Sequence, residues 1–232
     1  IILLIKIFVR VLGLDVVAQL QVTNILFVFA ILGMIIGSID AIRETNIKRM
    51  IAFSSVAQIG YIYMGIGLGT QAGLVAACFH IIVHAITKPM LFSAAGGLAD
   101  ASGHNKHFDK LVGSAYRNPI AGFAFALGSF SMIGIPFFAG FATKYYLASA
   151  AMQVPGKMWL ALFALAVSTV LNAVYYIKAL AIIFFKEKQN TVKYKNPKTY
   201  IIGMSAFIVA NILMGLFYQP VVDIIIQGMK VF

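Results

Sequence analysis

The sequence has 232 residues, of which 61% are apolar and 11% charged, and its mean hydropathy is +0.93. Soluble domains are roughly 45–50% apolar and about 25% charged, so this composition excludes both an ordinary soluble protein and a cleaved leader joined to a soluble domain. The net charge is +11, but the basic residues cluster in short loops between apolar runs, where they favour lipid headgroups over nucleic acid. The sequence therefore predicts an integral membrane protein that contacts lipid and binds no nucleic acid.

The apolar runs define the expected helices, because a membrane-spanning helix needs about 20 residues. The first run has no polar lead-in, which indicates the middle of a helix and a functional unit larger than this sequence. The last run is followed by an amphipathic tail from Pro220, expected at the membrane interface. Together they predict an all-α polytopic membrane protein, a single bundle of about eight transmembrane helices over residues 1–232. The predicted segments are 1–13, 22–42, 47–68, 71–99, 119–134, 138–152, 157–185 and 199–219.

Two places predict discontinuous helices. Pro89 lies inside the fourth segment and lacks the amide that would bond to the Ala85 carbonyl. The sequence GIPFFAG places Gly134, Pro136 and Gly140 ahead of a short segment. Irregular backbone at membrane depth is tolerated where protein or a water-filled cavity covers it, and such breaks often line transport sites.

The sequence HIIVHAITKP carries three titratable side chains, His80, His84 and Lys88, at a spacing of four. On a helix they fall near one face, and Lys88 lies too deep for its amine to reach the interface easily. Histidine exchanges protons near neutral pH, and burial disfavours the charged form of an amine. The pattern therefore predicts a ladder of proton acceptors along about 12 Å of helix. The alternative is a pair of hydrogen-bonded core histidines, with Lys88 paired to a fixed acid. No third ligand accompanies the histidines, so no metal site is predicted.

Two further lysines are candidates for the same chemistry. Lys144 follows the second predicted break and lies in a short segment, although an interfacial lysine at a helix start is the alternative. Lys6 lies in the opening run with Arg10 one turn later, and here the alternative is an anchor at the end of a helix.

Weaker polar features occur in two other segments. Lys48, Ser54 and Ser55 give the third segment a polar start, so they are secondary candidates whose simplest role is structural. The seventh segment contains Asn172, Tyr175, Tyr176 and Lys178. These could line a wet path, but aromatic residues near a helix end more often form an interfacial belt.

The acidic residues all fall at segment ends or in loops, so the buried lysines have no evident counter-charge within this chain. A partner carboxylate is therefore expected from a neighbouring subunit or from an N-terminal half outside this sequence. The acids are Asp15, Asp40, Glu44, Asp100, Asp109, Glu187 and Asp223.

Several linked motifs resemble the antiporter-like subunits of respiratory NADH:quinone oxidoreductase (complex I), energy-converting membrane-bound hydrogenases and Mrp-type cation/proton antiporters. They are TNIKRMIAFSSVAQIGY at 45–61, HIIVHAITKPMLFSAAGG at 80–97 and GIPFFAGFATK at 134–144. The opening LLIKIFVRVL resembles the lysine-bearing discontinuous helix in the middle of those subunits. Asn46 stands where the family usually has aspartate.

The resemblance implies a fourteen-helix fold with two inverted five-helix repeats, of which this chain would be helices seven to fourteen: one repeat with flanking helices. It implies that Lys6 is the central lysine that pairs with a buried glutamate of the other repeat. It further implies that Lys88 belongs to the central hydrophilic axis and that Lys144 gates exit to one side. The implied location is the cell (inner) membrane of a prokaryote.

The predicted function is translocation of protons, or of sodium ions, within a multisubunit membrane complex. The chain itself carries no catalytic residue and no cofactor, and redox chemistry or ion exchange elsewhere in the complex would drive the transport. Two alternatives stay open: a structural subunit that conducts nothing, and a stand-alone secondary carrier. The type of complex also stays open. The membrane orientation stays open too, because the basic loops at 43–49 and 106–117 are expected on one side of the membrane and the basic loop at 186–198 on the other.

Overall fold

The computed structural model describes residues 1–185 and 193–230, without the side chains of Leu14, Asp15, Ala18 and Lys230. Most of the predicted basic loop 186–198, including Glu187, lies outside the described residues. The helices are α1 (Ile2–Lys6), η1 (Ile7–Leu12), α2 (Leu14–Gln19), α3 (Val22–Arg43), α4 (Ile47–Gly67), α5 (Gln71–Asp100), η2 (Phe108–Lys110), α6 (Ser114–Arg117), α7 (Pro119–Ile133), α8 (Ala139–Met152), α9 (Pro155–Ile183), α10 (Lys198–Leu216) and α11 (Tyr218–Lys230).

Five helices within these described ranges are long and apolar enough to cross a membrane: α3, α4, α5, α9 and α10. Short capping motifs separate them. The side chain of Asn46 accepts hydrogen bonds from the backbone amides of Lys48 and Arg49 at the start of α4, and Thr70 caps Gly73 in the same way at the start of α5. Asn46 thus supplies the capping oxygen that an aspartate would provide.

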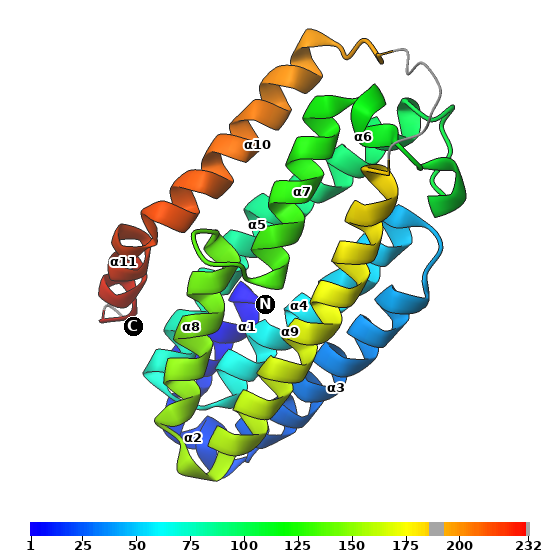
Figure 1. The fold of residues 1–232 in the computed structure, drawn as a ribbon. Coiled ribbons are helices and arrows are strands. Elements are labelled where there is room, and N and C mark those ends of the chain that lie inside the picture. Colours follow the sequence, from blue (N-terminus) through cyan, green and yellow to red (C-terminus); the bar gives the residue numbers. More distant parts are fainter. Residues whose placement is uncertain (186–192, 231–232) are drawn as a thin grey trace.

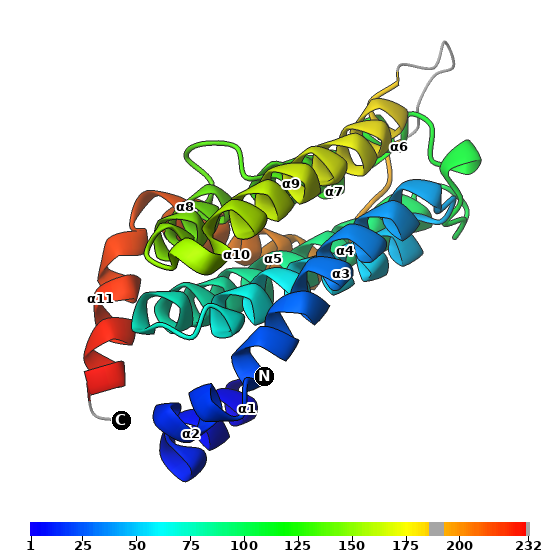
Figure 2. The same ribbon diagram turned by 90° about the horizontal axis from the view of Figure 1, so that it is seen from below.

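The long helices lie side by side in one bundle, with α3 packed against α4, α4 against α5, and α9 across α3 and α7 (Figures 1 and 2). In Figure 1, α8 starts beside the lower end of α7 and continues in about the same direction, and each helix has fewer residues than a span needs. Together they form one interrupted crossing beside α5 and α9.

The interruption between α7 and α8 confirms the predicted break at GIPFFAG. Gly134 ends α7 with a φ of 91°, a left-handed conformation that favours glycine. At Gly140 a side chain is excluded, because a Cβ would lie 1.7 Å from the Ser131 carbonyl oxygen. The backbone amide of Gly140 instead bonds to the Ser131 hydroxyl at 3.2 Å, which fixes the two half-helices to each other.

The break predicted at Pro89 is wrong, because α5 continues without interruption from Gln71 to Asp100. Pro89 and Ala85 both lie on the exposed side of the helix. The opposite side of α5 packs against α4, α7 and α8. One missing hydrogen bond is therefore not enough to end the helix.

The opening segment forms α1 and a π-helical stretch, η1, that ends at Gly13 with a φ of 79°. Ile5 and Phe8 pack against apolar residues of α4 and α5. At the other terminus, the predicted amphipathic tail is α11, whose Val222 packs against α5 and α8. Its location at a membrane interface stays a prediction.

Candidate functional site

Buried polar side chains gather in the interior of the bundle, although burying polar groups costs free energy that an all-apolar core would avoid. They come from α3, α4, α5, α8 and α9, so the site depends on the whole bundle. Its members are Ser38, Ser54, Gln58, Tyr61, His80, Lys88, Lys144, Ser168, Asn172, Tyr175 and Tyr176. Partly buried His84 and Thr169 adjoin them.

The Lys88 amine lies between α4 and α9, and only 4% of the residue is exposed. Its Nζ donates to the Ile51 carbonyl at 3.2 Å, to the Ser54 hydroxyl and to the Tyr176 hydroxyl at 3.5 Å. Ser54 and Tyr176 also bond to each other at 3.0 Å. All three acceptors are neutral oxygens, so they stabilise an ammonium group without neutralising its charge.

The Lys144 amine lies at the interruption between α7 and α8, with 8% of the residue exposed. Its Nζ donates to the Ile133 carbonyl at 2.6 Å and to Thr169 Oγ1 at 3.0 Å. It also lies 5.4 Å from the centroid of the Tyr61 ring. Gly134 leaves room for the lysine, because a Cβ there would lie 2.9 Å from the Lys144 Cδ. The break therefore supplies both the space and a carbonyl at a helix C-terminus, where partial negative charge favours a cation.

His80 and His84 continue the site along α5. The His80 ring centroid is 5.6 Å from that of Tyr61 and 6.5 Å from that of His84. Among the described residues, neither ring nitrogen of His80 has a hydrogen-bond partner, and the same holds for His84 Nε2 and Gln58 Nε2. Buried polar atoms are normally hydrogen-bonded, so these are the positions in the site where water is the expected partner.

A network of uncharged side chains centred on α9 lies between the two lysine groups; the sequence pointed to Asn172, Tyr175 and Tyr176 but not to Ser38 or Ser168. Asn172 accepts from the Tyr175 hydroxyl at 2.8 Å and donates to the Tyr61 hydroxyl at 3.2 Å. The Tyr61 hydroxyl donates to Ser168 at 2.9 Å, and Ser38 on α3 bonds to Asn172 at 3.2 Å. Tyr175 and Tyr176 are fully buried, so the predicted interfacial belt is wrong for them.

The described carboxylates lie away from this site. Their ion pairs join Arg49 to Glu44 at 2.8 Å, His104 to Asp100 and Lys110 to Asp109, and none involves Lys88 or Lys144. Across residues 1–185 and 193–230, no three His, Cys, Asp or Glu side chains gather in a group that could hold a metal ion.

Four other predicted residues lie outside the cluster. Lys6 and Arg10 are exposed on the opening segment, and Lys6 lines a small apolar cavity of about 100 Å³ beside Cys78. Lys48 is half-buried near Gly96. The hydroxyl of Ser55 bonds to the Ile51 carbonyl of its own helix at 3.0 Å, whereas the neighbouring Ser54 reaches Lys88.

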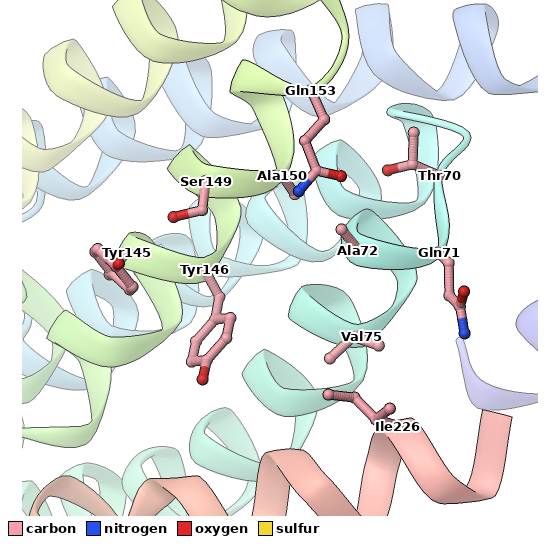
Figure 3. Close-up of a pocket in the computed structure, with 10 residues that line it drawn as sticks. All are labelled: Thr70, Gln71, Ala72, Val75, Tyr145, Tyr146, Ser149, Ala150, Gln153 and Ile226. Atoms are coloured by element: carbon pink, nitrogen blue, oxygen red, sulfur yellow. The ribbon is translucent and has the colours of Figure 1, made fainter. Parts of the chain in front are cut away.

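A larger cavity of about 670 Å³ opens at the end of the bundle where α4 turns into α5 (Figure 3). Its lining comes from Thr70 and the first turns of α5, from the second half of α8, and from Ile226 of α11. In the part of the chain that the structure describes, none of the predicted site residues lines it. The cavity is thus separate from the lysine and histidine cluster.

Membrane-length helices around a cluster of buried polar side chains define a polytopic membrane protein with a polar interior. Residues 3–172 match the transmembrane family described as NADH:quinone oxidoreductase/Mrp antiporter. The chain belongs to this family of antiporter-like membrane subunits, as the three motifs predicted.

Individual relatives agree with this assignment. NADH-quinone oxidoreductase subunit N of Thiobacillus denitrificans is 32% identical over 221 residues, which is 95% of this chain and 45% of the relative. The same subunit of Rickettsia bellii is 34% identical over 191 residues, covering 82% of this chain and 41% of the relative. This chain thus spans less than half the length of these relatives.

Two solved structures share the fold. A chain of the membrane-bound sulfane sulfur reductase, an archaeal respiratory membrane complex, superposes with a TM-score of 0.82 at 28% identity, over 89% of this chain and 42% of that one. A chain of the Mrp complex from Dietzia sp. DQ12-45-1b superposes with a TM-score of 0.78 at 23% identity, over 92% of this chain and 48% of that one.

Proposed function

We propose that this chain forms the proton-conducting part of an antiporter-like subunit in a multisubunit membrane complex. The observation that carries the proposal is the pair of buried amines, Lys88 and Lys144, held by neutral oxygens with no described carboxylate beside them. A buried amine in such surroundings is poised between its charged and neutral forms, so a modest change in nearby charge can load or unload a proton.

The histidines would carry protons between the two amines. His80 and His84 lie on the same helix as Lys88, and the His80 ring lies beside the Tyr61 ring that also faces Lys144. Their unpartnered nitrogens favour water molecules as the links, since a transfer step needs a hydrogen-bonded neighbour. Because each proton state alters the charge felt by the next group, the sites would titrate as a coupled set.

The rest of the complex would supply what this chain lacks. We propose that a carboxylate from a neighbouring subunit, or from the part of the protein outside this sequence, pairs with exposed Lys6. Other membrane subunits would supply the driving redox chemistry or ion exchange, in a prokaryotic cell membrane. The titratable groups of the proposed path are amines and imidazoles, which bind protons and not sodium, so we propose protons as the transported ion.

The test is proton uptake by sealed vesicles that carry the intact complex, with Lys144→Ala and Lys144→Arg compared with the unaltered protein. Both variants should lose uptake while the complex still assembles, because arginine does not release its proton at ordinary pH. Lys178→Ala is the matched control, since this exposed lysine bonds to the Ile42 carbonyl at 3.3 Å, outside the cluster. Wild-type uptake by both Lys144 variants would favour a scaffold that conducts nothing.

Ion replacement separates the two candidate ions. Uptake measured without added sodium should keep its full rate if the cluster passes protons. A rate that requires sodium, and saturates with it, would instead identify sodium as the transported ion.

A further inference from the structure

The Lys88 side of the site ends at an asparagine. Ser54 holds the Lys88 amine and bonds to the Tyr176 hydroxyl at 3.0 Å, and the Tyr176 ring packs against the Tyr175 ring with centroids 4.6 Å apart. The Tyr175 hydroxyl then donates to Asn172 Oδ1 at 2.8 Å. Each of these residues is buried, so this arm is held by protein contacts on every side.

The Lys144 side ends at the same asparagine. The Asn172 Nδ2 donates to the Tyr61 hydroxyl at 3.2 Å, and the Tyr61 ring lies 5.4 Å from the Lys144 Nζ. Thr169, three residues before Asn172 on α9, accepts from the Lys144 amine at 3.0 Å. The two arms therefore meet at one amide group, with its oxygen on one side and its nitrogen on the other.

An amide is a poor link for moving protons, although it is a good link for fixing geometry. A hydroxyl can accept one proton and release another, whereas a side-chain amide would have to pass through its imidic acid form to do the same. Its oxygen and nitrogen, however, impose one acceptor and one donor direction on their neighbours. The bridge through Asn172 is thus suited to fix the position of one arm relative to the other, while proton transfer follows the histidines.

We infer that Asn172 is a positioning residue that couples the Lys88 and Lys144 sites through a neutral, hydrogen-bonded bridge. This inference rests on the proposed function and adds a residue to it. Hydrogen bonds in series polarise one another in a low-dielectric interior. Gain of a proton at one amine therefore changes the polarisation of the bridge and, through it, the environment of the other amine, and His80 lies beside the Tyr61 end of the bridge.

The test is the pH profile of proton uptake by vesicles that carry the whole complex. Asn172→Leu removes the hydrogen bonds to Tyr61, Tyr175 and Ser38 and keeps the number of side-chain heavy atoms, and it should displace the midpoint of the profile by about one pH unit, the equivalent of the net contribution of one hydrogen bond. Asn211→Leu is the matched control, because this buried asparagine on α10 donates to Thr87 at 2.9 Å outside the bridge. It should leave the midpoint unchanged.

A double-mutant cycle tests the bridge without removing the asparagine. Tyr61→Phe and Tyr175→Phe each delete one hydroxyl, one on each side of Asn172, and both keep the ring. If the two hydroxyls act in series, loss of either one already interrupts the bridge. The double variant should therefore shift the midpoint of the pH profile no further than the single variant with the larger shift. Single shifts that add up in the double variant would overturn the inference, and so would wild-type pH profiles in both single variants and the double variant. If Asn172→Leu prevents assembly, this cycle decides the question alone.

The outcomes separate the inference from the function on which it rests. If Lys144→Ala abolishes uptake and the bridge variants keep the wild-type profile, only the inference fails. If Lys144→Ala leaves uptake intact, the proposed function itself fails.

Discussion

At the residue scale, the site depends on the chemistry of lysine among neutral acceptors. Lys88 and Lys144 each bond to a backbone carbonyl and a hydroxyl, Ser54 for the first and Thr169 for the second. Such acceptors stabilise the charged form only in part, and a full counter-charge would hold the proton in place. Under the proposed function, this arrangement would let both amines respond to charges on other subunits.

Ser54 provides a direct test of this arrangement. Ser54→Ala removes an acceptor from the Lys88 amine, and since a hydrogen bond to a charged group contributes about 1.5–3 kcal/mol, uptake should fall roughly tenfold or more. Ser55→Ala is the control: it deletes the hydroxyl of the next residue, which bonds to the Ile51 carbonyl of its own helix and not to Lys88. Vesicle uptake rates that fall equally in both variants would mean that helix packing, and not the Lys88 contact, is responsible.

The sequence predicts the charged members of the site better than the neutral ones. His80, His84 and Lys88 are conspicuous because ionisable groups are costly in an apolar run. Ser38 and Ser168 give no such signal, because serine can bond to the carbonyl one turn earlier in any helix. For Asn172 a usable signal exists: its spacing from Ser168 and from Tyr175 and Tyr176 places all four on one side of α9.

At the element scale, the two predicted helix breaks differ in what surrounds them. Gly134 and Gly140 lie in the packed interior, where backbone and the Lys144 side chain fill the space that a Cβ would need. Pro89 lies on an exposed surface, where its ring fits. Both places contain a proline, but only the second also has glycines, and the positive φ of Gly134 and the close backbone contact at Gly140 accompany the interruption there.

Gly140→Ala tests the packed junction. The new methyl group would overlap the Ser131 carbonyl oxygen and force the half-helices apart, at a cost of about 1–3 kcal/mol or more. Gly156→Ala is the control, because nothing lies within 4 Å of a Cβ at that position. Thermal denaturation of the purified complex should show a lower midpoint for Gly140→Ala alone; equal midpoints would contradict the close contact.

Pro89→Ala tests the uninterrupted helix. Alanine restores the amide that bonds to the Ala85 carbonyl, so the thermal midpoint should stay constant or rise, and proton uptake should be kept. Loss of uptake in an assembled, stable complex would show that the freed carbonyl takes part in transport.

At the scale of the whole molecule, hydropathy and loop chemistry predict the fold class well. The predicted segments 22–42, 47–68 and 71–99 end within a residue of α3, α4 and α5, because caps and basic turns mark those ends. Contacts between distant segments, such as Asn172 with Tyr61, are set by three-dimensional packing and have no signature in a single sequence.

Lys6 belongs to this scale because the partner proposed for it is a carboxylate of another subunit or repeat. In the intact complex, we expect Lys6→Ala to lower proton uptake at least several-fold, since the resemblance implies a pairing with a buried glutamate. The control is Lys198→Ala, an exposed lysine at the start of α10. Unchanged uptake in the assembled complex would mean that Lys6 is an anchor at the membrane surface.

The measurement that tests the central claim most directly is proton uptake by vesicles carrying the complex with Lys88→Ala or Lys88→Arg. Lys88 lies between Ser54, Tyr176 and the Ile51 carbonyl, so a titratable amine at this position is what the account requires. Both variants should assemble and both should lose uptake, since alanine has no proton to pass and arginine does not release its own. Normal uptake by both would contradict the account and leave the buried polar cluster as a packing feature.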